Sequence, residues 1–158
     1  MSLVSSALLK PELVFVDIDL ADRSALFKFL ERELLARGYV RPSWHEAIVE
    51  REKNYPTGLD CEAIQVAIPH TDPEHIVEPY IAIVRPRASV LFEGMAGLPD
   101  VQAQLIVNLG LQAHEDEQVK ALQTLMGIFT DIPSVEELLR QDDARGLHDV
   151  FAAEMNRL

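Results

Sequence analysis

The residue best placed to do chemistry in this sequence is His70, which follows Pro69 at the end of an apolar run. In that run Ile64, Val66 and Ile68 alternate with other residues, which is the pattern of a half-buried strand. Pro69 has no N–H to donate and a fixed φ, so the strand is expected to end there or to lie at a sheet edge. The residue before a proline is pushed toward extended geometry. His70 is therefore expected at the rim of a sheet, on a stiff lead-in, where it could do acid–base or covalent chemistry.

Two residues upstream of His70 could act on the same group. Arg51 lies near the end of an expected helix, and Thr57 lies in the turn after it. An arginine offers a planar fork of donors that suits phosphate oxygens, and a threonine offers a hydroxyl that can reorient as charge develops. If the helix packs beside the strand, both side chains converge on the imidazole. This combination suits phosphoryl transfer, in which positioning and stabilisation of charged oxygens dominate.

The sequence carries no recognisable means of holding a nucleotide. It has no Walker A pattern, and its seven glycines are scattered singly. A nucleotide-binding protein usually cradles the phosphates in a glycine-rich loop. A phosphoryl group is therefore expected to arrive on another protein, which makes the chain a relay rather than a kinase.

The segment from His70 to His75 also admits a metal-binding interpretation. It holds two histidines together with Asp72 and Glu74, side chains of the kinds that ligate transition metals. Pro73 interrupts any regular spacing, and no second cluster completes a coordination set. We therefore expect no metal, and we expect the two carboxylates to open a short helical turn, where they favour exposed N–H groups.

The elements that would position these residues follow from apolar periodicity and from capping and turn residues. Strands are predicted at 13–18, 64–68, 80–84, 89–92 and 105–109. Helices are predicted at 22–37, at 44–53, across 119–129, from a capping box at Ser134, and across 147–155. The clearest apolar helix faces are Leu26, Phe27, Leu30 and Leu34, and Val119, Leu122, Met126 and Phe129. The predicted fold is α/β (α+β), with a mixed sheet of four to five strands flanked by helices on both faces.

Length and composition limit the kinds of protein that the chain could be. Its 158 residues predict a single domain, 1–158, and 48% apolar residues predict a globular fold. A net charge of −12 argues against nucleic acid or an anionic membrane surface as a partner, and it suits either a basic protein partner or solubility alone. The single cysteine, Cys61, excludes an internal disulfide and a cysteine-rich zinc site. Without a signal peptide or an apolar run of about 18 residues, the chain is expected in the cytoplasm, with no direct membrane insertion.

Three motifs occur in order with suitable spacing: Arg51-Glu52, Pro56-Thr57-Gly58 and Ala67-Ile68-Pro69-His70. Together they resemble the signature of the fructose/mannitol-type IIA domain of the bacterial phosphotransferase system. The resemblance covers about residues 12 to 155. Within that family, the chain looks most like the galactitol-type branch.

The resemblance implies a function for the site. His70 would take a phosphoryl group from the phosphohistidine of the carrier protein HPr and pass it to a cysteine of a IIB partner. IIB would phosphorylate a sugar or sugar alcohol during uptake through the membrane component IIC. Arg51 matches the arginine beside the phosphorylated histidine, and Thr57 matches a small hydroxyl position. The family also suggests that Nε2 attacks while an acceptor, which the sequence does not identify, holds the other ring nitrogen.

One position departs from the mannitol-type pattern. Mannitol-type members carry a second histidine at the start of a late helix, where this chain has Gln118. A glutamine can hydrogen-bond a phosphoryl oxygen or the imidazole, but it cannot carry a proton or a positive charge. His114 is not expected to replace that histidine. Because the same fold family includes nitrogen-type regulators, an alternative hypothesis is a regulatory module in which phosphorylation of His70 controls a protein partner.

Overall fold

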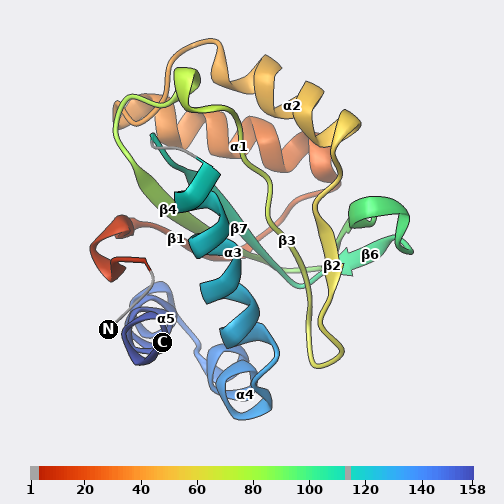
Figure 1. Ribbon diagram of the computed structural model, residues 1–158, viewed down its shortest axis with the longest axis vertical. Helices are drawn as coiled ribbons and strands as arrows, with labels where there is room; N and C mark the ends of the chain where they lie inside the picture. Colours follow the sequence, from red (N-terminus) through yellow and green to blue (C-terminus); the bar gives the residue numbers. More distant parts are fainter. Residues whose placement is uncertain (1–3, 113–114) are drawn as a thin grey trace.

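The centre of the molecule is a mixed β-sheet, seen in a computed structural model that describes residues 4–112 and 115–158. The described part of the sheet has five strands in the order β1-β4-β7-β3-β2 (Figure 1). Strands β1 and β4 pair in parallel, as do β7 and β3, whereas β4 with β7 and β3 with β2 pair antiparallel. The bounds are β1 Leu9–Ile18, β2 Gly58–Asp60, β3 Gln65–Ala67, β4 Tyr80–Pro86 and β7 Leu105–Gly110.

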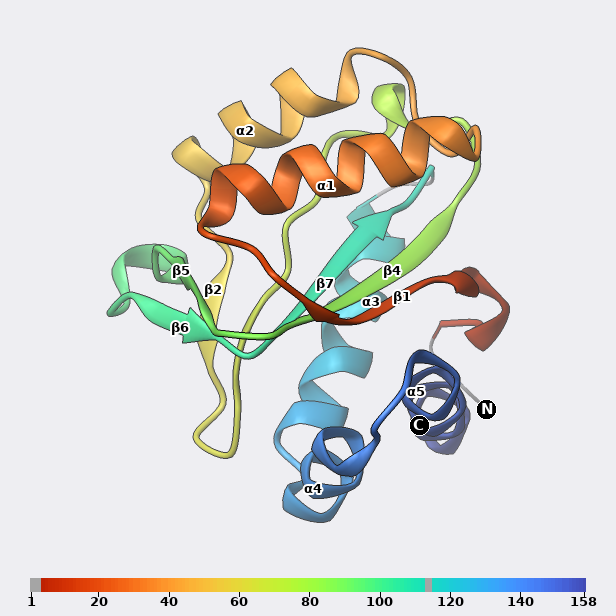
Figure 2. The same ribbon diagram turned by 180° about the vertical axis from the view of Figure 1, so that it is seen from behind.

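Helices cover both faces of this sheet. On one face lie α1 (Arg23–Ala36) and α2 (Trp44–Asn54), and on the other lie α3 (Glu115–Phe129), α4 (Ile132–Arg140) and α5 (Ala144–Arg157) (Figures 1 and 2). The pleat of β4 serves both cores, because Ile81 and Ile83 join the cluster with α3 to α5 while Tyr80, Ala82 and Val84 join the cluster with α1 and α2. The predicted fold class is confirmed.

The helix predictions are right for α1 and partly wrong for α3 and α4. The four apolar residues predicted for α1 are its buried residues, and Asp22 caps its start. In α3, Val119 and Met126 are instead exposed, because Ala121, Leu125, Ile128 and Phe129 form the buried face. The capping box at Ser134 is also wrong. Asp131 caps α4 by accepting a hydrogen bond from the backbone N–H of Ser134, which places Ser134 inside the first turn.

A small second sheet lies beside the β2–β3 edge and holds one of the motif glycines in place. It pairs β5 (Val90–Phe92) with β6 (Val101–Ala103), and the loop between them carries a 3-10 turn, η3 (Met95–Gly97). In β2, Gly58 bridges to Gly94 of that loop. A Cβ added at Gly58 would lie 2.6 Å from the carbonyl oxygen of Glu93, so only glycine fits this approach. Both β2 and β6 are three-residue strands that the sequence did not predict.

The strand that leads to His70 ends where the proline predicts, but it is not half-buried. β3 lies between β7 and β2, and both of its faces are covered. Val66 and Ile68 pack against the α3–α5 side, and Ala67 packs against the α1–α2 side. Within the described residues, no helix is long and apolar enough to cross a membrane.

Candidate active site at the end of strand β3

A buried hydrogen-bond chain fixes the backbone that carries His70. The carbonyl oxygen of Pro69 accepts hydrogen bonds from the backbone N–H of Leu109 (3.3 Å) and from Nδ2 of Asn108 (2.9 Å). The side-chain oxygen of Asn108 accepts in turn from the hydroxyl of Tyr80 (2.6 Å). Since Tyr80 belongs to β4 and Asn108 to β7, two neighbouring strands hold the end of the β3 segment, and His70 stands on a rigid support.

The imidazole of His70 is oriented by the backbone carbonyl two residues before it. Its Nδ1 lies 2.9 Å from the carbonyl oxygen of Ile68. A carbonyl oxygen only accepts, so Nδ1 carries the hydrogen in this contact, and Nε2 of a neutral ring keeps its lone pair. The Ile68 carbonyl is an acceptor of the kind that the sequence could not identify. The side chain is half-buried, which leaves the ring partly open to solvent.

The surroundings of His70 favour the neutral ring. Burial is the largest effect and lowers the pKa of His70 below its ordinary value of 6.5. The positive charge of Arg51 lowers it further, whereas the hydrogen bond to Ile68 and the negative charge of Asp72 raise it. The net direction is downward, so the ring is mainly uncharged near neutral pH. An uncharged imidazole is the nucleophilic form.

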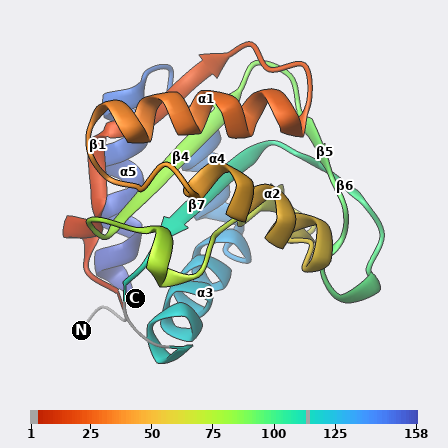
Figure 3. The same cartoon turned by 90° about the horizontal axis from the view of Figure 1, so that it is seen from above.

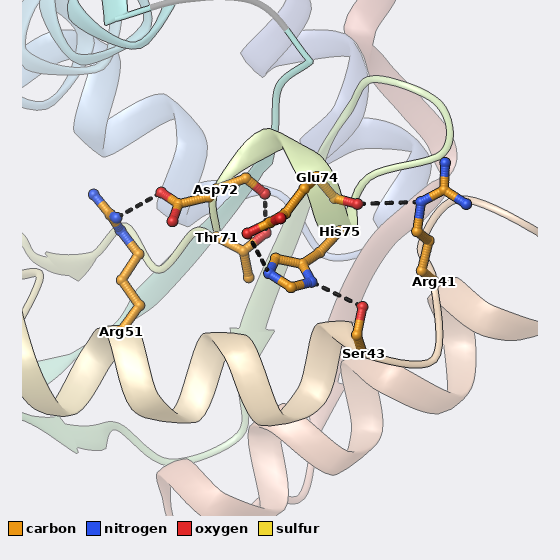
Figure 4. A network of polar contacts seen from close by, with 7 residues as sticks. All are labelled: Arg41, Ser43, Arg51, Thr71, Asp72, Glu74 and His75. Atoms are coloured by element: carbon orange, nitrogen blue, oxygen red, sulfur yellow. Dashed lines mark hydrogen bonds and ion pairs between the residues drawn. The ribbon is translucent and has the colours of Figure 1, made fainter.

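Arg51 reaches this site from the last turns of α2, the helix on which the sequence placed it. Its guanidinium pairs with Asp72, with 2.9 Å between Nη1 and Oδ1, rather than with the imidazole (Figure 4). The guanidinium also lies over the ring of Tyr55, 5.4 Å from its centroid. Arg51 is therefore held between an aromatic ring and a carboxylate, close enough to His70 to affect its pKa.

Thr57 lies behind the site rather than on its open side. Its side chain is only 6% exposed, and its hydroxyl donates to Oε1 of Glu52 (2.8 Å) while its N–H donates to Oε2 (2.7 Å). The same hydroxyl accepts a hydrogen bond from the backbone N–H of Ile68 (3.2 Å). Thr57 thus connects the buried carboxylate of Glu52 to the residue whose carbonyl orients His70.

Glu52 is a residue whose importance the sequence reasoning missed. It is 2% exposed, and burial raises its pKa to about 7 in spite of the two hydrogen bonds from Thr57. The signal was present in the helix spacing, because Glu52 lies four residues after the buried Ile48 and so on the same face of α2. Asn108 gave no such signal, since nothing in an apolar strand sequence indicates which carbonyl an amide will reach.

Gln118 is placed on the first turns of α3 and is partly buried. Among the hydrogen bonds of residues 4–112 and 115–158, none joins Gln118 to His70, Arg51 or Asp72. Its role at the site stays a prediction. His114 lies outside the described residues.

The side chains of the metal-binding alternative are engaged with protein groups: Asp72 pairs with Arg51, and the Glu74 carboxylate lies 3.5 Å from Nε2 of His75. The short turn η2 (Pro73–His75) forms where it was expected, just after Asp72. Nδ1 of His75 lies 2.8 Å from the hydroxyl of Ser43, and the carbonyl of Glu74 accepts from Arg41 (3.1 Å) (Figure 4). Within the described ranges, no group of three or more His, Cys, Asp or Glu side chains is placed to hold a metal ion. Instead, η2 is tied to the start of α2, which crosses the same side of the sheet (Figure 3).

Comparison with known proteins identifies the family. The family model described as "Phosphoenolpyruvate-dependent sugar phosphotransferase system, EIIA 2" matches residues 7–154. The chain belongs to this family. One relative in it is the PTS system galactitol-specific EIIA component of Escherichia coli K12, which is 32% identical over 122 residues, or 77% of this chain and 81% of that protein.

Solved structures of two IIA proteins share the fold. The structure of E. coli enzyme IIA mannitol in complex with phosphorylated enzyme IIB mannitol matches with a TM-score of 0.72 and 21% identity, covering 92% of this chain and 97% of that one. The nitrogen regulatory protein IIA-Ntr of Neisseria meningitidis matches with a TM-score of 0.71 and 23% identity over 92% and 97%. The fold thus occurs in an enzyme IIA that is seen with phosphorylated enzyme IIB and in a nitrogen regulatory protein.

Proposed function

We propose that this EIIA protein is a phosphocarrier that takes a phosphoryl group on Nε2 of His70. The observation that carries the proposal is the hydrogen bond from Nδ1 to the carbonyl of Ile68. It fixes the ring as the tautomer whose lone pair is on Nε2, and burial keeps that ring uncharged. The rigid sheet end below it and Arg51 beside it supply the positioning that phosphoryl transfer needs.

The proposed donor is the phosphohistidine of HPr. The lone pair of His70 Nε2 attacks the phosphorus, a new N–P bond forms, and the N–P bond to the donor imidazole breaks with its electron pair returning to that ring. The ring of His70 gains a positive charge, which the carbonyl of Ile68 stabilises through the Nδ1 hydrogen. In the next step, a cysteine thiolate of a IIB partner attacks the same phosphorus, and His70 leaves as a neutral imidazole.

Within this mechanism, Arg51 has the clearest electrostatic role. A guanidinium beside the phosphoryl oxygens offsets the charge that they carry during transfer. Thr57 was predicted as a further phosphoryl-binding residue, but its hydroxyl is engaged with Glu52 and Ile68. Its contribution would therefore come through the carbonyl that orients His70. Gln118 remains a weaker candidate for a phosphoryl oxygen.

The proposed system is sugar uptake, with the membrane component IIC as an indirect partner through IIB. The galactitol-specific relative supports a sugar alcohol of that kind as the transported compound. The mannitol complex supports a IIB partner, because it holds a protein of this fold against phosphorylated IIB. The whole chain, 1–158, would act as one IIA domain in the cytoplasm.

Phosphotransfer from phosphoenolpyruvate through enzyme I and HPr, read by intact mass, tests the site. The wild-type protein is expected to gain one acid-labile phosphate, and His70→Ala none. His75→Ala is a matched control, because it removes a neighbouring imidazole and should still be labelled. Normal labelling of His70→Ala would show that the site is elsewhere.

A regulatory module is the second candidate, because the fold is shared with the nitrogen regulatory protein IIA-Ntr. In that case His70 would be phosphorylated without passing the group to a transporter. Adding a IIB protein from a galactitol-type system distinguishes the two. A carrier is expected to lose its phosphate to the IIB cysteine, whereas a regulator keeps it.

A further inference from the structure

The carboxylate of Asp72 forms an ion pair with Arg51, the arginine that a phosphoryl group on His70 would need. Nη1 of Arg51 lies 2.9 Å from Oδ1 of Asp72, and the side chains are 29% and 62% exposed. Asp72 is only two residues from His70, and the residue between them is fixed: Thr71 is 2% exposed, and its hydroxyl donates to the carbonyl of Asp72 (3.1 Å). The backbone of Asp72 is therefore held close to His70, and the ion pair with Arg51 places its carboxylate.

The ion pair does little for the stability of the fold. Exposed pairs of this kind contribute between zero and about 1 kcal/mol. The same two charges do act on the site, since the charges of Arg51 and Asp72 shift the pKa of His70 in opposite directions. The pair is therefore better placed to act on His70 than to hold α2 to the segment after β3.

A phosphoryl group adds up to two negative charges and three acceptor oxygens beside this pair. On Nε2 of His70, it would compete with Asp72 for the guanidinium of Arg51, and its charge would be repelled by the carboxylate. Both effects raise the free energy of the phosphorylated protein relative to the free one. Both effects disappear when the phosphoryl group leaves for an acceptor, so its departure is favoured.

We propose that Asp72 keeps the phosphoryl group on His70 easy to transfer, by sharing Arg51 with it and by repelling it. This rests on the proposed function of His70 as the phosphoryl acceptor. Arg51 alone would lower the barrier and also hold the group after it arrived. Asp72 weakens the second effect, so the phosphorylated protein remains a carrier rather than a sink.

Equilibration with phosphorylated HPr tests this inference, with both phosphoproteins quantified by intact mass at several salt concentrations. Asp72→Asn should shift the phosphoryl group toward this protein by about threefold to fivefold at low salt, and less as salt screens the charges. Asp72→Glu should stay close to wild type, because it keeps the charge. Glu74→Gln is the matched control, since it removes a charge from the same segment but its carboxylate does not contact Arg51, and it should leave the partition unchanged.

The outcomes separate this inference from the proposed function. If Asp72→Asn slows transfer in both directions and leaves the partition unchanged, then Asp72 only positions Arg51, and the inference is wrong. A shift toward HPr would also overturn it. If the wild-type protein takes no phosphate on His70 at all, the failure belongs to the proposed function instead.

Discussion

Two adjacent residues of α2 serve the site in opposite ways. Arg51 points to the open side and pairs with the exposed Asp72, whereas Glu52 points into the core and accepts two hydrogen bonds from Thr57. The exposed pair can rearrange when a charged group arrives, because water solvates whatever it leaves. The buried group cannot, because an unsatisfied polar atom there is costly. The helix therefore supplies adjustable charge on one face and fixed geometry on the other.

Removing the partly exposed side chain of Arg51 should slow phosphoryl transfer and leave the stability of the fold nearly unchanged. For Arg51→Ala we expect phosphoryl transfer from HPr to fall by about a hundredfold, since losing one donor to the transferred oxygens typically costs about 3 kcal/mol of barrier. Rapid-quench kinetics would measure it, and urea unfolding should change by less than about 1 kcal/mol. Arg41→Ala, which removes an arginine from the segment just before α2, should transfer normally. Wild-type rates for Arg51→Ala would remove the arginine from the mechanism.

Removing the buried carboxylate of Glu52 should instead destabilise the fold. Glu52→Ala leaves the N–H and hydroxyl of Thr57 without their acceptor, and we expect the free energy of unfolding in urea to fall by about 3 kcal/mol. Glu50→Ala, on the exposed side of the same helix, should change it by less than about 0.5 kcal/mol. Similar losses for the two variants would mean that the buried hydrogen bonds do not set the stability of this region.

The comparison also has a pH signature. The folded pKa of Glu52, about 7, is above its ordinary value of 4.5, so the folded chain binds this proton more tightly than the unfolded chain. Its contribution to stability is then greatest at low pH and is lost as the pH rises through 7. Arg23 opposes the shift and Glu93 adds to it. Between pH 5 and pH 7, wild type should lose about 2 kcal/mol relative to Glu52→Gln in urea titrations. Parallel curves for the two proteins would contradict this pKa.

The smallest expected effect is that of Thr57, which connects the buried Glu52 to the backbone that orients His70. Thr57→Val removes the hydroxyl that joins Glu52 to the N–H of Ile68, and we expect a loss of about 1.5 kcal/mol in unfolding free energy. The ¹⁵N shifts of the His70 ring should also show Nδ1 less fully protonated, because the carbonyl of Ile68 is less firmly placed. Thr57→Ser should restore both properties. A stability loss with unchanged ring shifts would make Thr57 purely structural.

The sequence predicted the parts of the molecule that depend on local patterns. The apolar face of α1, the end of β3 shortly before Pro69 and the place of His70 just after it follow from periodicity and backbone chemistry. The three-residue strands β2 and β6 escaped, because they are too short for a period and are defined by their pairing. The buried face of α3 was misassigned because Val119 and Met126 are apolar but lie on the exposed side of the helix.

The site was predictable to a similar extent. The proximity of Arg51 to the His70 segment could be expected from the motif order, but its partner Asp72 could not. Ion pairs and the orientation of Thr57 depend on which surfaces meet in the folded chain. No local rule decides whether a hydroxyl faces a buried carboxylate or solvent. The roles of such residues therefore become clear only in the folded structure.

The buried chain from Tyr80 through Asn108 to Pro69 has a consequence for how the protein moves. Amide hydrogens in such positions exchange with solvent only when the surrounding sheet opens. The N–H of Leu109, which donates to the carbonyl of Pro69, is expected in this slow group, although Leu109 is the bridge partner of His70 itself. The histidine has no flexible arm with which to reach out. If His70 carries the phosphoryl group as we propose, each partner would have to present its phosphorus or its thiolate at a fixed point in space.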